Sequence, residues 1–180
     1  MQKSIILTLL NNNIYFLKQL FMQKKMRFYF YIAFCVKILL LGLFSSEYLD
    51  SLFIPFVHYF VQTLSNPWEY YFQNNLNLDS FPYHGLMLYL LTPCMFFIHF
   101  FEIENQFIVN LVFKLPLFIS DMLLLITLLQ LFPEKAKHVF LFYFLNPIII
   151  YAIYIHAQLD SIPMALFMLG IYYISKDIMA

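Results

Sequence analysis

The sequence predicts an all-α integral membrane protein with about four transmembrane helices, plus interfacial or re-entrant helices in a long first outer loop. Of the 180 residues, 63% are hydrophobic and only 11% are charged. This composition leaves too little polar surface to cover a water-soluble globule. The hydrophobic residues gather in runs that approach the roughly 20 residues needed to cross a bilayer. We therefore expect lipid to surround much of the chain.

Charge and cysteine content exclude several classes of protein. Ten basic and ten acidic residues cancel, so no nucleic-acid partner is expected. Cys35 and Cys94 lie in apolar runs without metal-ligand spacing, which predicts neither a disulfide framework nor a zinc site. No small-residue cleavage site precedes the basic cluster at 24–27. Residues 1–27 are therefore expected to form a cytoplasmic leader and not a cleaved signal peptide.

Five apolar runs compete to be membrane spans: 28–44, 84–101, 115–132, 139–155 and 162–174. Between the first two lies a polar and aromatic segment with turn signals at Asn66-Pro67, Asn74-Asn75 and Phe81-Pro82. Within this segment, residues 52–64 space their apolar side chains by one, three and four positions, and these side chains are Leu52, Phe53, Phe56, Val57, Phe60 and Leu64. This spacing predicts an amphipathic helix suited to the membrane surface.

The positions of Lys and Arg decide between two topologies, because these residues favour the cytoplasmic ends of spans. If all five runs cross, the basic residues that follow the third and fifth runs lie outside, against that rule. If 84–101 is re-entrant or lies along the outer interface, eight of the ten basic residues lie inside, namely Lys3, Lys18, Lys24, Lys25, Arg27, Lys135, Lys137 and Lys176. We therefore expect four spans and an outer loop at about 45–114, rich in acidic and aromatic side chains.

The clearest polar cluster follows the fourth run. His156, Gln158 and Asp160 lie at one helix mouth, and Pro163 suits the first turn of the next helix. Either Asp160 or Ser161 is a competent N-cap for that helix, and this ordinary structural role accounts for Asp160 alone. Because it leaves His156 and Gln158 unexplained, all three are candidate substrate-binding residues.

Asp50 is the candidate general base of the outer loop. A carboxylate at this position is suited to accept a proton from an attacking alcohol. The alternative is helix capping, for which Ser46, Asp50 and Ser51 are all competent. Glu47 is the competing base.

Lys114 opens the third run, and Asp121 follows seven residues later on the same helical face. A lysine at the outer end of a span either binds a phosphate as a point charge or anchors the helix at the interface. Lys37 lies in the middle of the first run, where it either snorkels or pairs with Asp121. His58, His99 and His138 are scattered singly, and we expect them to be structural or interfacial residues and not metal ligands.

Four stretches, in order, resemble the glycosyltransferase C (GT-C) superfamily of multi-span enzymes that use polyprenyl-phosphate sugars, including its mannosyl- and glucosyltransferase relatives. They are Asp50 with Asn66-Pro67-Trp68-Glu69-Tyr70-Tyr71, then Phe81-Pro82-Tyr83-His84-Gly85-Leu86, then Lys114-Leu115-Pro116 with Asp121, and finally Asn146-Pro147 with His156-Ala157-Gln158-Leu159-Asp160. Two positions depart from the family pattern, because His84-Gly85 replaces Pro-Pro and Ala157 replaces Gly. The resemblance covers roughly residues 27–175.

The resemblance implies a catalytic acid in the first outer loop, which in this family folds into helices parallel to the membrane. By this comparison residues 28–180 are the N-terminal portion of a GT-C-like module. Asp50 would be the catalytic base, with Lys114 contacting phosphate. Tyr83, His84, His156, Gln158 and Asp160 would complete the substrate site. No cofactor is implied, and a divalent metal stays open without a ligand set to support it.

The expected function is transfer of a sugar from a polyprenyl-phosphate donor to an acceptor on the extracytoplasmic or lumenal face of a plasma or endoplasmic reticulum membrane. GT-C members usually have eight or more spans, so a second chain or a missing C-terminal part is expected to supply the remaining helices. The alternative is a non-catalytic multi-span scaffold or partner subunit. A small transporter is less favoured, because the polar residues gather at one face and no internal repeat is present.

Overall fold

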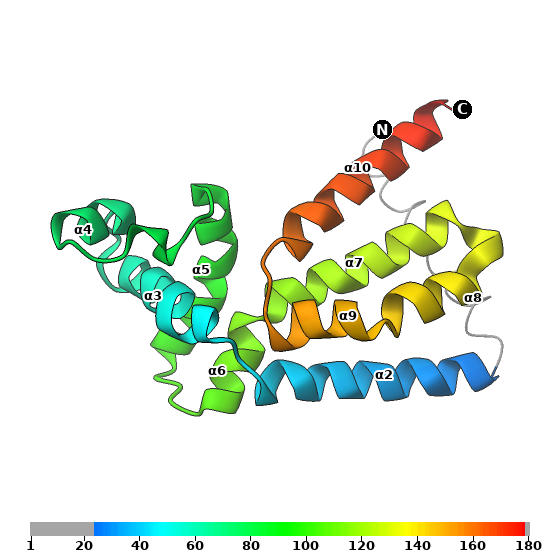
Figure 1. The fold of residues 1–180 in the computed structure, drawn as a ribbon, viewed down its shortest axis with the longest axis horizontal. Helices are drawn as coiled ribbons and strands as arrows, with labels where there is room; N and C mark the ends of the chain where they lie inside the picture. The colour runs from blue at the N-terminus through cyan, green and yellow to red at the C-terminus, as the bar shows by residue number, and fades with distance from the viewer. Residues whose placement is uncertain (1–23, 179–180) are drawn as a thin grey trace.

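The computed structural model describes residues 24–178, and every regular element among them is a helix. The all-α prediction is therefore confirmed for this part of the chain. Figure 1 shows two parts that lie end to end, a bundle of long helices and a lobe of shorter ones. This lobe is formed by the predicted outer loop at about 45–114, which includes the run at 84–101.

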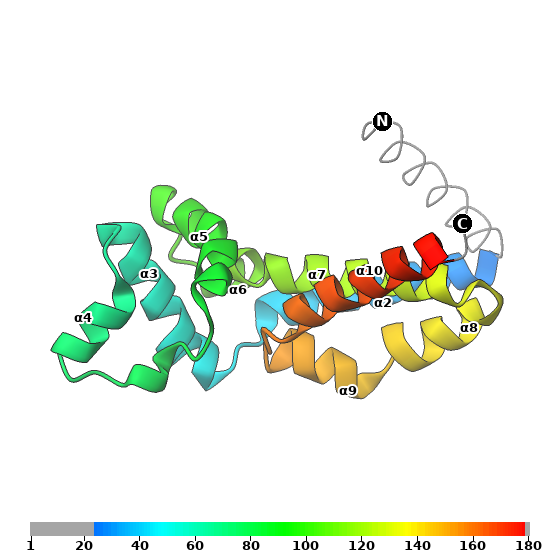
Figure 2. The ribbon, with the colours of Figure 1, turned by 90° about the horizontal axis from the view of Figure 1, so that it is seen from above.

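The bundle consists of four antiparallel passes. The first is α2 (Lys24–Leu43), which is followed after the lobe by α7 (Leu115–Leu131). The chain then returns through η3 (Pro133–Lys135), α8 (Ala136–Val139), η4 (Phe140–Phe144), α9 (Pro147–Ile150) and η5 (Tyr151–Ile155). The last pass, α10 (Ser161–Ile178), packs along α7 and diverges from the other helices toward its C-terminal end (Figures 1 and 2).

The lobe contains η1 (Leu49–Phe53), α3 (Ile54–Thr63), α4 (Pro67–Gln73), η2 (Leu78–Ser80), α5 (Gly85–Phe100) and α6 (Gln106–Phe113). Helix α3 packs against α5, and α6 packs against the end of α2. Gly42 allows this second contact, because a Cβ atom there would collide with the ring of Phe107. Asn66 caps α4 by accepting from the amides of Trp68 and Glu69, as its turn signal predicts.

The helix predicted at 52–64 forms, but most of its apolar face packs inside the lobe. Phe53, Phe56 and Val57 are buried inside the lobe and pack within its core cluster. Leu64 does not belong to this face, because it ends the helix with φ 53° and is 77% exposed. Tertiary packing therefore covers most of a surface that the sequence assigns to lipid.

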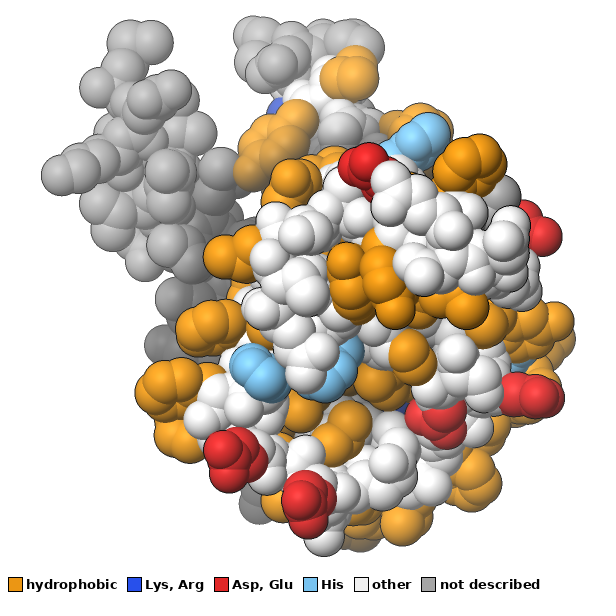
Figure 3. Space-filling view, turned by 90° about the vertical axis from the view of Figure 1, so that its left-hand side faces the viewer, with side chains coloured by type: hydrophobic (Ala, Val, Ile, Leu, Met, Phe, Trp, Pro, Cys, Tyr) orange, Lys and Arg blue, Asp and Glu red, His pale blue; other side chains and the backbone are white. Residues whose placement is uncertain are grey.

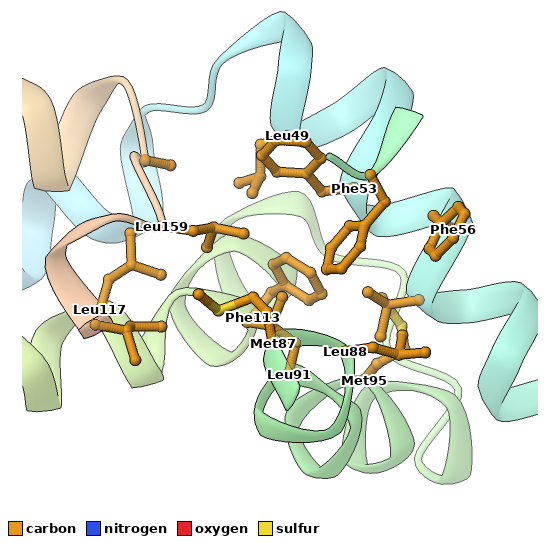
Figure 4. Packing of buried hydrophobic residues seen from close by; sticks show 14 of the residues in the cluster. Leu49, Phe53, Phe56, Met87, Leu88, Leu91, Met95, Phe113, Leu117 and Leu159 are labelled. Carbon is orange, nitrogen blue, oxygen red and sulfur yellow. The ribbon is translucent and has the colours of Figure 1, made fainter. Parts of the chain in front are cut away.

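One apolar cluster joins the lobe to the bundle (Figure 4). Leu49 and Phe53 of η1 meet Phe113 of α6, and Leu117 and Leu159 extend the cluster into the bundle. The labelled side chains of Figure 4 are all at most 8% exposed. Burial on this scale stabilises by roughly 1.5–3 kcal/mol for each large side chain, so this contact fixes the lobe against the bundle.

Two bends interrupt the long helices. Helices α6 and α7 meet at Lys114 with a 44° bend, just before a predicted span, and the third pass bends by 51° around Asn146-Pro147, within another. Each of these bent pairs has the length and apolar composition of a membrane span only when its two halves are taken together. Within the described residues, no unbroken helix combines that length with that apolar composition.

Candidate functional site

The predicted site residues come from segments far apart in sequence that meet where the lobe joins the bundle. The end of α2, the segment 44–50, the break at Lys114 and the end of η5 lie together there (Figure 1). Asp50 acts electrostatically on Lys114, and Asp160 acts electrostatically on Tyr83. The rings of Tyr48 and His156 are 6.1 Å apart at 88°.

Asp50 is not needed as a helix cap. The hydroxyl of Ser46 accepts a hydrogen bond from the Leu49 amide at 3.2 Å and caps this first turn instead. One carboxylate oxygen of Asp50, Oδ1, accepts from the Ser45 hydroxyl at 2.6 Å and from the Gln106 amide at 3.4 Å. The other oxygen accepts no hydrogen bond from the described residues. Asp50 is exposed, so this second oxygen is available to an incoming hydroxyl.

Glu47, the competing base, lines a shallow pocket. This pocket of about 250 Å³ is also lined by Tyr48, Ser51 and Leu52. Asp50 is not part of this lining, and its carboxylate bonds with Ser45 and Gln106 instead. The two candidate carboxylates therefore have different neighbours, although they lie in the same turn.

Lys114 lies in an environment that neither predicted role, phosphate binding or interfacial anchoring, describes. Its side chain is fully buried, and its Nζ donates to the carbonyl oxygens of Phe44 at 2.6 Å and Tyr154 at 3.1 Å. Each carbonyl lies at the end of a bundle pass, so one ammonium joins α2, η5 and the α6–α7 bend. Beside it, the Asn110 amide donates to the carbonyl of Gly42 at 3.2 Å. Gln106 and Asn110, which complete this polar cluster, lack any sequence signal that marks them as partners.

The turn between η5 and α10 depends on the backbone conformation of Ala157. This residue has φ 59°, in the left-handed region that favours glycine, at the position where the GT-C pattern has glycine. His156 is half-buried and stacks on Tyr151 at 6.0 Å and 11°. Gln158 is exposed, and its backbone amide donates to the carbonyl of Ala152 at 2.9 Å.

Asp160 is exposed, and its side chain caps no helix among the described residues. Pro163 has no N–H to accept from, and the Ile162 amide already donates to the carbonyl of Leu159 at 3.0 Å. Across the junction, Tyr83 packs against the rings of Phe53 and Phe81. Burial, and after it the negative charge of Asp160, raise the pKa of the Tyr83 hydroxyl above its ordinary value.

His84 is exposed and occupies the N-cap position of α5, although its ring makes no capping hydrogen bond. Its carbonyl oxygen accepts from the amide of Met87 at 2.9 Å. Among the predicted site residues, Tyr83 and Asp160 are therefore close enough to act on each other, whereas His84 is held only through its backbone.

Lys37 pairs with Asp121, which is one of its two predicted alternatives. The Lys37 Nζ lies 2.7 Å from Asp121 Oδ2, and both side chains are fully buried. Asp121 also accepts from the hydroxyls of Tyr143 at 2.8 Å and Tyr154 at 2.5 Å. The ammonium lies 3.8 Å from the ring centroid of Phe144. This network belongs to the interior of the bundle and not to its exposed junction.

The lobe has a strong charge bias. Residues 45–113 contain six acidic residues and no Lys or Arg, the acids being Glu47, Asp50, Glu69, Asp79, Glu102 and Glu104. Figure 3 shows the free end of the lobe, with acidic side chains around its rim and apolar side chains and histidines between them. No group of three or more His, Cys, Asp or Glu with the geometry of a metal site occurs within the described residues.

Comparison with known proteins adds no relative. No family model, curated protein sequence or solved structure matches this chain.

Proposed function

We propose that this protein is an integral membrane sugar transferase that uses a polyprenyl-phosphate donor and acts on the extracytoplasmic or lumenal face. The observation that supports it is that at least one residue from each of four separated motif stretches lies near one junction. Asp50 acts electrostatically on Lys114, and Asp160 acts electrostatically on Tyr83. The rings of Tyr48 and His156 are 6.1 Å apart. The proposal also draws on the GT-C resemblance of these stretches.

A membrane location is supported by the apolar surface of the helices. On α5, the exposed fractions of Leu86, Tyr89 and Phe100 are 67%, 63% and 66%. On α10, Phe167 and Ile174 are 64% and 62% exposed. Soluble monomers rarely expose large contiguous apolar patches, so this number of exposed apolar side chains favours lipid as their environment.

The orientation is supported by the opposed charges of the two ends. The acidic lobe lies at one end of the bundle. The basic start of α2, the turn 133–137 and the end of α10 lie at the other. Basic residues favour the cytoplasmic side, so the lobe and junction would face outward.

In the proposed reaction, an acceptor hydroxyl attacks the anomeric carbon of the donor sugar. The bond from that carbon to the phosphate oxygen breaks, and polyprenyl phosphate leaves with the bonding electrons. Asp50 takes the hydroxyl proton on the carboxylate oxygen that accepts no hydrogen bond from the chain. His156, Gln158 and Asp160, which follow η5, would orient the donor or the acceptor.

The leaving phosphate needs positive charge, and the lobe supplies none. Lys114, the nearest cation, already donates to two backbone carbonyls. Stabilising the leaving group therefore requires either a rearrangement at Lys114 or a cation from another source. A second chain that contributes further helices is the partner we propose for this role.

The buried state of Lys114 also favours a second candidate function, a non-catalytic membrane scaffold or partner subunit. In that case Lys114 serves only to join three helical segments, and the junction residues bind no substrate. The two candidates differ in whether the exposed carboxylates matter for transfer.

The test compares three carboxylate variants in membranes supplied with a radiolabelled polyprenyl-phosphate sugar and with whatever partner makes the wild type active. Asp50→Asn should reduce turnover by about 100-fold or more, the scale of general-base removal. Asp79→Asn, which changes an exposed lobe carboxylate of η2, is the matched control and should leave turnover unchanged. If Glu47→Gln is inactive and Asp50→Asn is active, the base is Glu47. Full activity in both variants would support the scaffold.

A further inference from the structure

Two histidines that the sequence separates by 41 positions form a pair on the lobe. His58 lies on α3 and His99 near the end of α5, and their ring centroids are 5.4 Å apart with the ring planes at 69°. His58 is partly exposed and His99 is exposed. Both rings are therefore open to solvent.

The separation of the rings matches that of two imidazoles that share a metal ion. Imidazole nitrogens bind zinc at about 2.0–2.1 Å, and tetrahedral geometry places the centroids of two such rings roughly 5.2 Å apart. The observed 5.4 Å agrees with this value. Because χ2 is broad for histidine, each ring can rotate to direct a nitrogen toward a shared ion. The helices that hold the rings pack against each other, so the pair is preorganised.

The chemical surroundings favour a cation. The lobe contains six carboxylates and no Lys or Arg, which raises the local concentration of cations. Among the described residues no third His, Cys, Asp or Glu completes a closed site. Water would therefore fill the remaining positions, as in an open and exchangeable metal site.

We propose that His58 and His99 form a two-histidine site for a divalent transition metal of the zinc type, which bridges α3 and α5. Imidazole ligands suit Zn²⁺, Cu²⁺ and Ni²⁺, whereas Mg²⁺ and Ca²⁺ prefer oxygen ligands. The site joins two helices of the lobe, and its two histidines are not among the residues proposed for sugar transfer. Because the metal binds the folded lobe, it should also stabilise the packing of α3 on α5.

The experiment uses the full chain in detergent, purified without a histidine tag, and measures Zn²⁺ affinity by competition with a chromophoric chelator. Wild type should bind one equivalent. His58→Asn and His99→Gln should each weaken binding by at least about tenfold, because each removes one of two ligands. His138→Gln, which changes an exposed histidine of α8, is the matched control and should bind like wild type. Mg²⁺ should not compete.

A second measurement does not depend on the variants. The electron paramagnetic resonance spectrum of Cu²⁺ added at one equivalent to wild type should show coupling to two imidazole nitrogens. Coupling to a single nitrogen would overturn the proposal, as would Zn²⁺ affinity that survives in both His58→Asn and His99→Gln. Failure of sugar transfer would leave the proposal intact, because neither measurement involves the junction.

Discussion

Ala157 adopts a backbone conformation that suits glycine, with φ 59°, and its side chain is only 2% exposed. A β-branched residue there would face both the left-handed penalty, about 1–2 kcal/mol, and a tightly packed site. We predict that Ala157→Val lowers the free energy of unfolding by about 2 kcal/mol or more. Ala157→Gly should be close to neutral, since relief of strain offsets the lost methyl packing. Thermal unfolding in detergent measures both.

The control for this prediction is Ala136→Val, at a helical residue with φ −52°. Ala136 is only partly buried, at the edge of a core cluster, so the helix propensity of valine dominates and the cost should stay within about 1 kcal/mol. Equal destabilisation at positions 136 and 157 would mean that the backbone at Ala157 is not strained.

Asp160 allows a second prediction about a single residue. Because its carboxylate makes no capping hydrogen bond in the described structure, Asp160→Asn and Asp160→Ala should both change the free energy of unfolding by no more than about 0.5 kcal/mol. If Asp160 binds substrate, both variants should reduce sugar transfer at normal protein abundance, and His156→Ala should do the same. Destabilisation by Asp160→Ala alone would restore the capping interpretation.

At the scale of helical elements, the Lys37–Asp121 pair holds α2 and α7 together, while Tyr143 and Tyr154 add η4 and η5 to the same carboxylate. Removing one member of a buried pair leaves an uncompensated charge. We therefore predict that Lys37→Met lowers the free energy of unfolding by about 3–5 kcal/mol. Tyr154→Phe removes one neutral donor and should cost about 1–3 kcal/mol.

The double variant Lys37→Met/Asp121→Leu provides the decisive comparison. With both charges gone, no uncompensated buried charge is left, so it should be more stable than Lys37→Met alone, although the hydroxyls of Tyr143 and Tyr154 lose their carboxylate acceptor. A double-mutant cycle measured by unfolding in detergent gives the coupling energy. Strictly additive losses would show that the two side chains act independently.

At the scale of the whole molecule, opposed charge at the two ends predicts a membrane orientation. In a background with Cys35→Ser and Cys94→Ser, the single variant Lys135→Cys should react with membrane-impermeant thiol reagents only after the membrane is opened. Asp79→Cys and Asp160→Cys should react in intact cells or vesicles of native orientation, because the lobe and junction face outward. Labelling of positions 135 and 160 from the same side would exclude the four-pass arrangement.

Much of the element order follows from local sequence. Apolar runs predict the long helices, and Asn66-Pro67 predicts the start of α4, because these signals depend on side chains close in sequence. The bend at Lys114 is not predicted. It depends on carbonyl acceptors from Phe44 and Tyr154, 70 and 40 positions away. An apolar pattern predicts that a helix forms, but its direction depends on what it packs against.

By itself, the sequence determined that the described chain is helical, that its charges are separated between the lobe and the other end of the bundle, and that Lys37 has Asp121 as one potential partner. The tertiary structure alone decided that Lys114 is buried and joins three segments, and that His58 and His99 meet on the lobe. Composition and periodicity are properties of neighbouring residues, so they survive any packing of the helices. Which buried cation meets which acceptor, and which rings face each other, depends on the relative rotation of helices that loops of many lengths allow.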